Sequence, residues 1–131
     1  MVSVSQATNL NSNLGYGTQR PNLIADPNSS ASRSVARWFD TSAFRLAPQF
    51  TLGSSTRNPV RGPGLQNADL MLGKTFRLTE RVSTEVRAEA FNVSNTPPLG
   101  DPNGSFGSPA FGSITSAGNP RVFEFAVKVH F

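Results

Sequence analysis

Three segments of this sequence alternate apolar and polar residues along their length, and this period of two constrains the fold more than any other feature. In a β-strand alternate side chains point to opposite faces, whereas a helix would mix both kinds of residue on every face. The sequence therefore predicts three β-strands, at about 67–78, 82–93 and 121–131. The alternation is cleanest in the third strand, whose apolar residues are Phe123, Phe125, Val127, Val129 and Phe131.

The predicted strands are long and have two unlike faces. They run for about 10–12 residues, against the roughly 5–6 of ordinary globular sheets. A tilted strand needs roughly 9–11 residues to cross a bilayer, and a barrel wall needs one apolar and one polar face. The predicted fold is all-β, with antiparallel strands from the C-terminal end of a transmembrane β-barrel and long irregular loops. The charges expected to face the lumen are Asp69, Arg77, Glu85, Arg87, Glu89, Glu124 and Lys128.

The connections between the strands have the lengths that such a barrel requires. A tight turn through residues 79–81 keeps Leu78 and Val82 on one face, because opposed residues of an antiparallel pair share a face. The connection 94–120 is long and rich in Gly, Pro, Ser and Asn. Barrels of this kind have short periplasmic turns and long extracellular loops. With the chain ending in the periplasm, residues 1–66 and 94–120 are both expected outside the cell.

One residue breaks the apolar pattern. Lys74 falls on the apolar face, where a lysine costs roughly 2–4 kcal/mol at the bilayer midplane and much less near an interface. We expect its amine to snorkel toward the turn end of the strand. A bulge at Gly73 is the alternative, but it would turn Phe76 and Leu78 inward.

Residues 1–66 predict a long, mostly irregular loop region. Turn-forming Gly, Pro, Asn and Asp recur throughout it, and the one helical candidate is a short stretch near 34–39. The aromatic residues expected to pin the loop down by apolar contact are Trp38, Phe39, Phe44 and Phe50. A structureless stretch of this length is rare in a compact soluble domain and usually marks a functional loop or a linker.

The composition bears on metal binding, membrane helices and nucleic-acid binding. The chain has no cysteine, and its lone His130 cannot form a metal site by itself, so no metal or cofactor is expected. No apolar run reaches the roughly 18 residues of a transmembrane helix, and the first residues lack the pattern of a secretory signal. The net charge of +4 comes from scattered arginines in residues 1–66. A solvated loop surface explains that charge better than a nucleic-acid interface.

Catalytic patterns are weak, and no enzyme activity is expected. Glu85 and Glu89 share one strand face, but Arg87 lies between them and favours a salt-bridge row over acid–base catalysis. The Gly62-Pro-Gly64 sequence lacks the third glycine of a nucleotide-binding loop and reads as a turn. Tyr16 and Trp38 are candidate ligand contacts in an external loop, although packing is the more common role of such residues.

Several stretches resemble, in order and spacing, the C-terminal region of Oar-like TonB-dependent outer-membrane receptors, which often carry an N-terminal carboxypeptidase-regulatory-like domain. These stretches are Gly17-Thr-Gln-Arg-Pro-Asn-Leu23, Trp38-Phe-Asp-Thr-Ser-Ala-Phe44, Arg57-Asn-Pro-Val-Arg-Gly-Pro-Gly-Leu-Gln-Asn-Ala-Asp-Leu70, Phe76-Arg-Leu-Thr-Glu-Arg81, Arg87-Ala-Glu-Ala-Phe-Asn92 and Phe111-Gly-Ser-Ile-Thr-Ser-Ala-Gly-Asn-Pro-Arg121. The resemblance implies solute uptake across the outer membrane of a Gram-negative bacterium. It implies as partners the remainder of the parent barrel, outer-membrane lipid, TonB through a missing N-terminal part, and the barrel-assembly machinery. That machinery would read the last strand through a terminal signal formed by Phe123, Phe125, Val127, Val129 and Phe131.

The family's plug domain and most of its strands have no counterpart here, and three strands cannot close a barrel. The chain is therefore expected to be a fragment that is inactive alone. Two other functions stay open. A soluble β-sandwich module, for example one that binds carbohydrate, would need shorter strands and a second sheet over the apolar face. A non-transporting barrel, for adhesion or envelope structure, would share the strands and lack a plug.

Overall fold

The computed structural model describes residues 1–15, 17–29 and 33–131. These residues form two compact units, which we call the loop unit (residues 1–63 and 99–117) and the sheet unit (64–98 and 118–131). Regular structure is nearly all β, and no α-helix occurs in the described ranges, so the predicted fold class is confirmed. Nothing in those ranges forms a helix with the length and apolarity to span a membrane.

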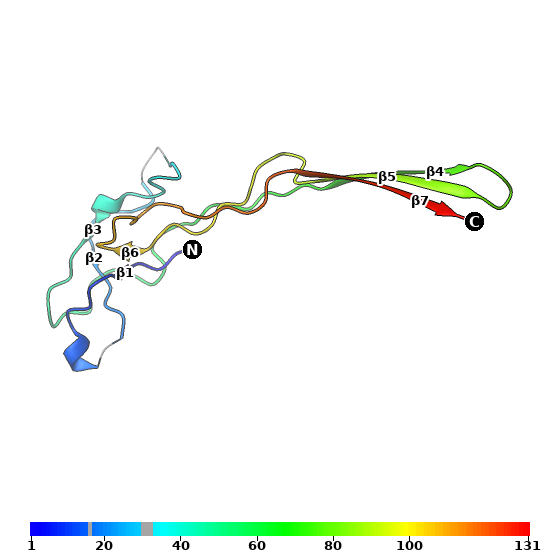
Figure 1. Ribbon diagram of the computed structural model, residues 1–131. Helices are drawn as coiled ribbons and strands as arrows, with labels where there is room; N and C mark the ends of the chain where they lie inside the picture. The colour runs from blue at the N-terminus through cyan, green and yellow to red at the C-terminus, as the bar shows by residue number, and fades with distance from the viewer. Residues whose placement is uncertain (16, 30–32) are drawn as a thin grey trace. The chain divides into compact units, whose positions relative to one another are not determined.

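The sheet unit contains one antiparallel sheet in the order β4-β5-β7 (Figure 1). Its strands are β4 (Leu70–Arg77), β5 (Ser83–Phe91) and β7 (Val122–His130), each slightly shorter than the segment whose alternation predicts it. Backbone pairing of β4 with β5 continues past both strand ends. Val93 N donates to Ala68 O at 2.8 Å, and Leu78 N donates to Val82 O at 3.0 Å.

The register brings the three apolar sets onto one face. On that face Leu72, Ala88 and Phe125 form one row across the sheet. On the opposite face Thr75, Glu85 and Lys128 form another. Pairing is continuous through Gly73, which lies opposite Arg87, so the strand has no bulge there. The two faces of the sheet therefore differ in the way the alternation predicts.

The loop unit has a hydrophobic core of its own. Four aromatic rings meet edge to face with centroids 5.2–5.8 Å apart, and they belong to Phe39, Phe44, Phe106 and Phe111. The buried residues that complete this core are Val2, Val4, Ala43 and Val60. Two short strand pairs frame it: β1 (Ser5–Gln6) with β6 (Ser105–Phe106) in parallel, and β2 (Asn22–Leu23) with β3 (Phe44–Arg45) antiparallel. Residues 1–66 are therefore mostly irregular in secondary structure, yet apolar contacts pack them around this core.

Residues 34–39 do not form the expected helix. Ser34 and Arg37 exchange backbone hydrogen bonds in a tight turn. Within and just after this turn the backbone bonds to the distant segment 112–114, because Ile114 N donates to Val35 O and Trp38 N donates to Gly112 O, both at 2.8 Å. These long-range bonds use the groups that helical i→i−4 bonds would need. The only short helices described are the 3₁₀ turns η1 (Ser12–Leu14) and η2 (Thr41–Ala43).

The aromatic anchors of the loop region divide into two groups. Phe39 and Phe44 are buried, and Trp38 packs against the core. Phe50 is 71% exposed and adopts a positive φ of 63°, so it does not pin the loop. Its backbone N–H donates to Asn11 Oδ1 at 2.6 Å, which shows that this turn is held by polar contacts instead.

Candidate functional site

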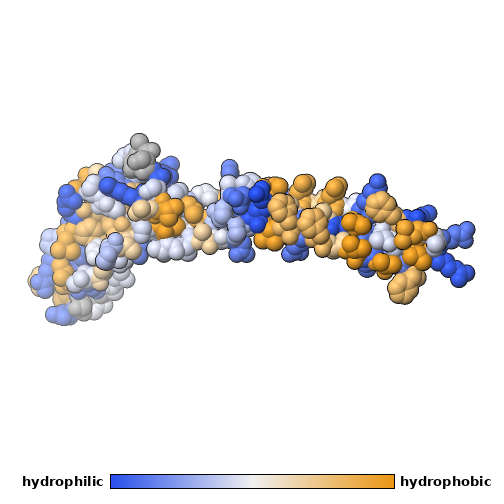
Figure 2. All heavy atoms as spheres, turned by 45° about the horizontal axis from the view of Figure 1, so that its top comes forward, coloured by the Kyte–Doolittle hydropathy of each residue, from blue (hydrophilic) through white to orange (hydrophobic). Residues whose placement is uncertain are grey.

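The most distinctive surface of the molecule is the apolar face of the β4-β5-β7 sheet. Large apolar side chains stand exposed along all three strands, and Figure 2 shows apolar surface gathered over this part of the chain. Phe125 is 80% exposed, Leu72 is 73% exposed and Val127 is 67% exposed. The other exposed members of this face are Leu70, Phe76, Val86, Phe123 and Val129. Soluble monomers rarely expose a contiguous apolar patch of more than a few hundred Å².

No described residue of the sheet unit forms a second sheet over this apolar face. A soluble β-sandwich would bury such a face against another sheet at a distance of about 10 Å. The exposed Phe125 and Leu72 therefore argue against the sandwich and for a face that meets an apolar solvent.

The opposite face carries charges of both signs. Arg87 lies between two carboxylates, with its guanidinium 3.1 Å from Glu85 and 3.4 Å from Glu89. The register sets Lys128 opposite Glu85, which extends the row of alternating charge across β5 and β7. Glu124 lies opposite Glu89, and like charges in directly opposed positions are destabilising. The pairing of Arg87 with Glu89 offsets part of that repulsion.

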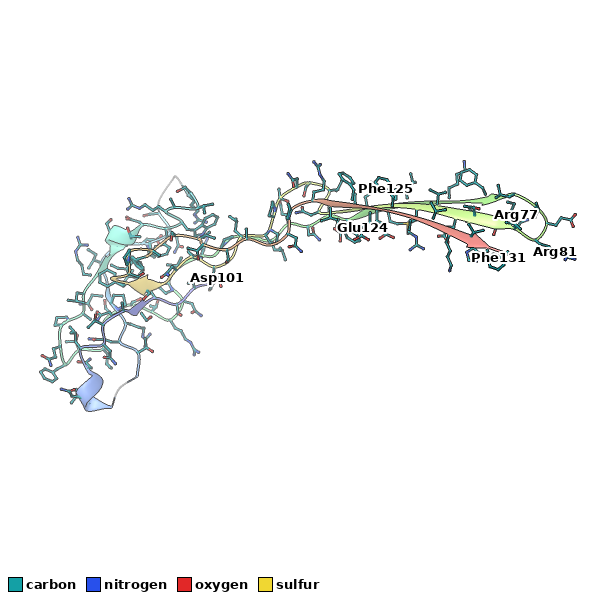
Figure 3. All side chains as sticks on the ribbon, viewed as in Figure 1. Arg77, Arg81, Asp101, Glu124, Phe125 and Phe131 are labelled. Atoms are coloured by element: carbon teal, nitrogen blue, oxygen red, sulfur yellow. The ribbon has the colours of Figure 1, made fainter. Side chains whose placement is uncertain are left out.

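Further charged and aromatic residues mark the two ends of the sheet. Arg77, Arg81 and Phe131 lie at the turn end of the sheet, whereas Glu124 and Phe125 lie toward the other end (Figure 3). His130 is opposite Ser83 at the same turn end. Arg77 and His130 both follow the polar-face parity, so both lie on the charged face at the turn end.

Lys74 faces the apolar side, as the sequence predicts. The register sets it opposite Val86. Its amine lies 5.2 Å from the ring centroid of Phe76, within the range of a cation–π contact. Phe76 is nearer the turn, so the amine leans toward the turn end of the strand, which is the direction that snorkelling requires.

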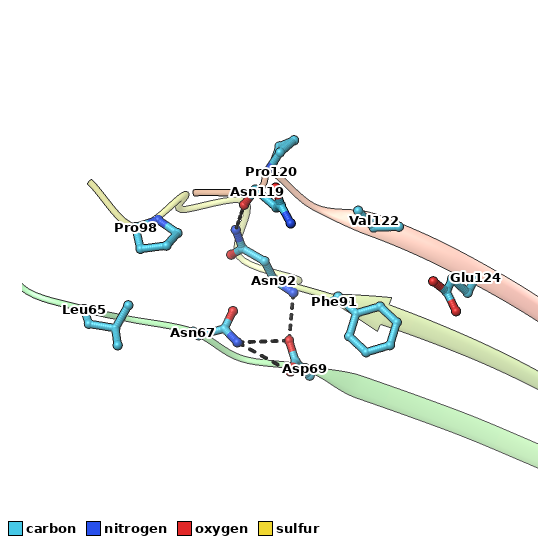
Figure 4. A pocket seen from close by; sticks show the side chains of 10 residues that line it. All are labelled: Leu65, Asn67, Asp69, Phe91, Asn92, Pro98, Asn119, Pro120, Val122 and Glu124. Atoms are coloured by element: carbon cyan, nitrogen blue, oxygen red, sulfur yellow. Dashed lines mark hydrogen bonds between the residues drawn. The ribbon is translucent and has the colours of Figure 1, made fainter. Parts of the chain in front are cut away.

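A pocket of about 520 Å³ lies at the loop end of the sheet (Figure 4). It is lined by Leu65, Asn67, Asp69, Phe91, Asn92, Pro98, Asn119, Pro120, Val122 and Glu124. The Asp69 carboxylate accepts hydrogen bonds from Asn92 N at 2.8 Å and from Asn67 Nδ2 at 3.2 Å. Asn92 has a φ of 51°, in the left-handed region that asparagine tolerates, and this conformation ends β5. Asp69 therefore acts here as the acceptor that ties two strand ends together.

The loop unit contains a second pocket, of about 420 Å³, which sequence reasoning missed. Its lining is Ser3, Val4, Ser5, Thr18, Arg20, Thr56 and Arg57. These residues come from three segments far apart in the sequence and form no motif. The scattered arginines are the only feature of the sequence that points to this pocket, and a solvated loop surface explains them equally well.

The structure describes the surroundings of one of the two candidate ligand contacts, Trp38. Trp38 donates its indole N–H to Arg61 O at 2.9 Å, and the Arg33 guanidinium lies 5.8 Å from its ring centroid. These contacts give Trp38 a packing role in the loop unit. Tyr16 lies outside the described residues.

Asp40 caps η2 and has a shifted acidity. Its carboxylate accepts from the Ser42 hydroxyl at 2.6 Å and from Ser42 N at 3.0 Å, and it pairs with Arg37 at 2.9 Å. The hydrogen bonds from Ser42, assisted by Arg37, lower the pKa of Asp40 below its ordinary value because they stabilise the ionised form.

A family model described as "Outer membrane beta barrel domain" matches residues 1–124, which is nearly the whole chain. No curated protein and no solved structure matches the chain.

Proposed function

The chain belongs to the outer membrane β-barrel domain family, and on that premise we propose that it forms part of the wall of a TonB-dependent receptor that takes up a solute. The family points to the outer membrane of a Gram-negative bacterium. The observation that carries the proposal is the β4-β5-β7 sheet, with an exposed apolar face on one side and a charged face on the other. Lipid would cover the first face, and the water-filled interior would meet the second.

The dimensions of the sheet support a membrane-crossing role. Strand β7 has nine residues. At about 3.3 Å per residue such a strand is roughly 30 Å long, and a tilt of about 40° reduces its height to roughly 23 Å. The apolar band of an outer-membrane barrel is about 25 Å tall. The nine residues of β7 therefore cover nearly the whole height of the band.

The edges of the sheet imply partners. Among the described residues β4 and β7 each pair on one side only. Lipid does not tolerate an open sheet edge, because unpaired backbone groups there cost several kcal/mol each. We infer that further strands of a parent barrel cover both edges and that the chain is inactive alone. The resemblance in six ordered stretches supports TonB and the barrel-assembly machinery as further partners, and no catalytic role is proposed.

The placement of the two faces can be tested by cysteine scanning, because the chain has no native cysteine. Single Phe125→Cys and Val127→Cys variants would be labelled with a fluorophore in the outer membrane of cells that make the protein. Their matched controls are Ala126→Cys and Lys128→Cys, which lie on the same strand with opposite orientation. Brominated lipid should quench the label at 125 and 127 and spare it at 126 and 128. Equal quenching at all four positions would disprove a lipid-facing side.

Transport needs a separate test. Uptake of candidate scarce solutes would be compared in cells with and without TonB, using the protein that contains this chain. Uptake that depends on both supports the receptor assignment. A protein that assembles in the outer membrane and gives no TonB-dependent uptake would instead be a non-transporting barrel.

A further inference from the structure

The second pocket, in the loop unit, has the composition of an anion site. Two arginines and four hydroxyl-bearing residues line it, and the lining contains no carboxylate. We propose that this pocket binds the oxyanion group of a small soluble solute, such as a phosphate, sulfate or carboxylate. Such a site is independent of TonB-dependent uptake, because a barrel of any function could carry it in its loops.

Three segments lie side by side to build the pocket. Gln6 N donates to Gln19 O at 2.8 Å, and Ser55 N donates to Pro21 O at 3.1 Å. Gln6, Gln19 and Ser55 are buried where the segments pair, whereas the pocket-lining residues beside them in the chain, Ser5, Thr18, Arg20 and Thr56, are half-buried or exposed. The backbone pairing therefore brings these polar side chains to one pocket.

The layer beneath the pocket is held by buried hydrogen bonds. Gln6 Nε2 donates to Gln19 Oε1 at 3.0 Å. Gln19 Nε2 donates to the carbonyl oxygens of Pro48 and Thr51 at 3.1 and 2.9 Å. A site on such a scaffold loses little conformational freedom when a ligand binds.

The two arginines differ in what they already bind. Arg20 Nη1 donates to Ser55 O at 3.2 Å, which fixes its guanidinium at the pocket while leaving other N–H groups available. Arg57 makes no side-chain hydrogen bond or ion pair within residues 1–15, 17–29 and 33–131. A guanidinium offers five donors in a planar fork, which matches the geometry of an oxyanion. An anion between Arg20 and Arg57 would therefore satisfy donors that the protein leaves open.

The size and the charge of the pocket indicate which kind of ligand it would bind. Pockets for small molecules commonly measure about 300–1,000 Å³, and this one measures about 420 Å³. The only apolar residue in its lining is Val4, which is 1% exposed, so nothing there would receive an acyl chain. The lining has no aromatic ring on which a nucleic-acid base could stack. A soluble anionic solute fits these features better than a lipid headgroup.

The test measures binding of inorganic phosphate and sulfate to the full 131-residue chain in detergent by calorimetry at low ionic strength. Arg57→Gln should weaken phosphate binding by at least about tenfold, because it removes one charge-assisted contact to the anion. The matched control is Arg61→Gln, whose exposed side chain does not line the pocket and should leave affinity within about twofold. Arg57→Lys should lose less than Arg57→Gln, since it keeps the charge and loses the fork.

Each alternative result overturns the proposal. The first such result is that the wild-type chain shows no saturable binding of either anion, although its Trp38 emission confirms a packed loop unit. Alternatively, Arg57→Gln and Arg61→Gln would weaken binding equally, which would mean diffuse attraction to net positive charge. Binding only to vesicles that contain anionic lipid, and not to the free anions, would assign the pocket to a headgroup. Should Arg57→Gln alter Trp38 emission, the Arg57→Lys variant replaces it in the comparison. The proposal would then be contradicted if Arg57→Lys left the affinity for phosphate unchanged while Arg61→Gln weakened it.

Discussion

Placing an arginine at Val127 gives the sharpest test of the two-faced sheet, because a large loss of stability is expected in lipid and almost no change in water. Val127 lies near the middle of β7, on the apolar face, and is 67% exposed. An arginine at the midplane of a lipid-facing strand costs roughly 2–4 kcal/mol. The lost contact of the valine with lipid adds about 1 kcal/mol, which is its full burial value of roughly 1.5 kcal/mol scaled to the exposed part. Val127→Arg should therefore lower the free energy of unfolding by about 3–5 kcal/mol.

The matched control is Ala126→Arg, one residue away on the opposite face. It places the same charge opposite Arg87. A directly opposed like charge costs roughly 0.2–1 kcal/mol, well below the expected effect at Val127. If the sheet lay in water, Val127→Arg would change stability by no more than about 0.5 kcal/mol, as surface substitutions usually do.

The assay is denaturant unfolding of the barrel that contains this chain, reconstituted in lipid vesicles, with the wild type and both variants measured together. Vesicles are required because the expected cost arises from lipid contact. A Val127→Arg variant as stable as Ala126→Arg would refute the assignment of a lipid-facing side.

Three further perturbations follow from named contacts. Arg87→Ala removes the cation between Glu85 and Glu89, so it should lower the melting temperature more at low than at high ionic strength, as two melting curves would show. Lys74→Leu should raise stability in vesicles, by as much as roughly 2–4 kcal/mol because Lys74 lies in the same cross-strand row as Val127, and by less to the extent that its amine snorkels; a loss of stability there would mean that the amine makes a needed contact. The lowered pKa of Asp40 means that its contribution to stability is present above the unfolded value near 3.8 and is lost as pH falls through the folded pKa. Asp40→Asn should remove that pH-dependent part, and Trp38 emission followed from pH 7 to pH 2 would measure it; an identical titration in the variant would contradict the assignment.

The sequence predicted the strands because their signal is local. The period of two in 67–78, 82–93 and 121–131 follows from the geometry of a single extended chain, and no partner strand is needed to read it. The length of the turn at 79–81 then fixed which residues of the first two strands share a face. The observed opposition of Leu72 to Ala88 and of Gly73 to Arg87 agrees with that parity.

Sequence reasoning failed where distant segments decide the local structure. Residues 34–39 have a helical composition, but their backbone is bonded to residues 112–114, which no local rule anticipates. The core that joins Phe39 to Phe111 depends on the same meeting of segments. The anion pocket is a third case, because its lining comes from residues 3–5, 18–20 and 56–57, and their outward orientation is set by pairing between them.

The sequence by itself determined that this chain forms long strands with one apolar face and one charged face, because side-chain direction along a strand is a property of the backbone alone. Only the tertiary structure decided that the arginine-rich first half folds around an aromatic core and gathers two of its guanidinium groups at one pocket. This arrangement depends on hydrogen bonds and ring contacts between segments many residues apart, such as the hydrogen bond from Ser55 N to Pro21 O. Contacts of this kind cannot be predicted from any short window of sequence.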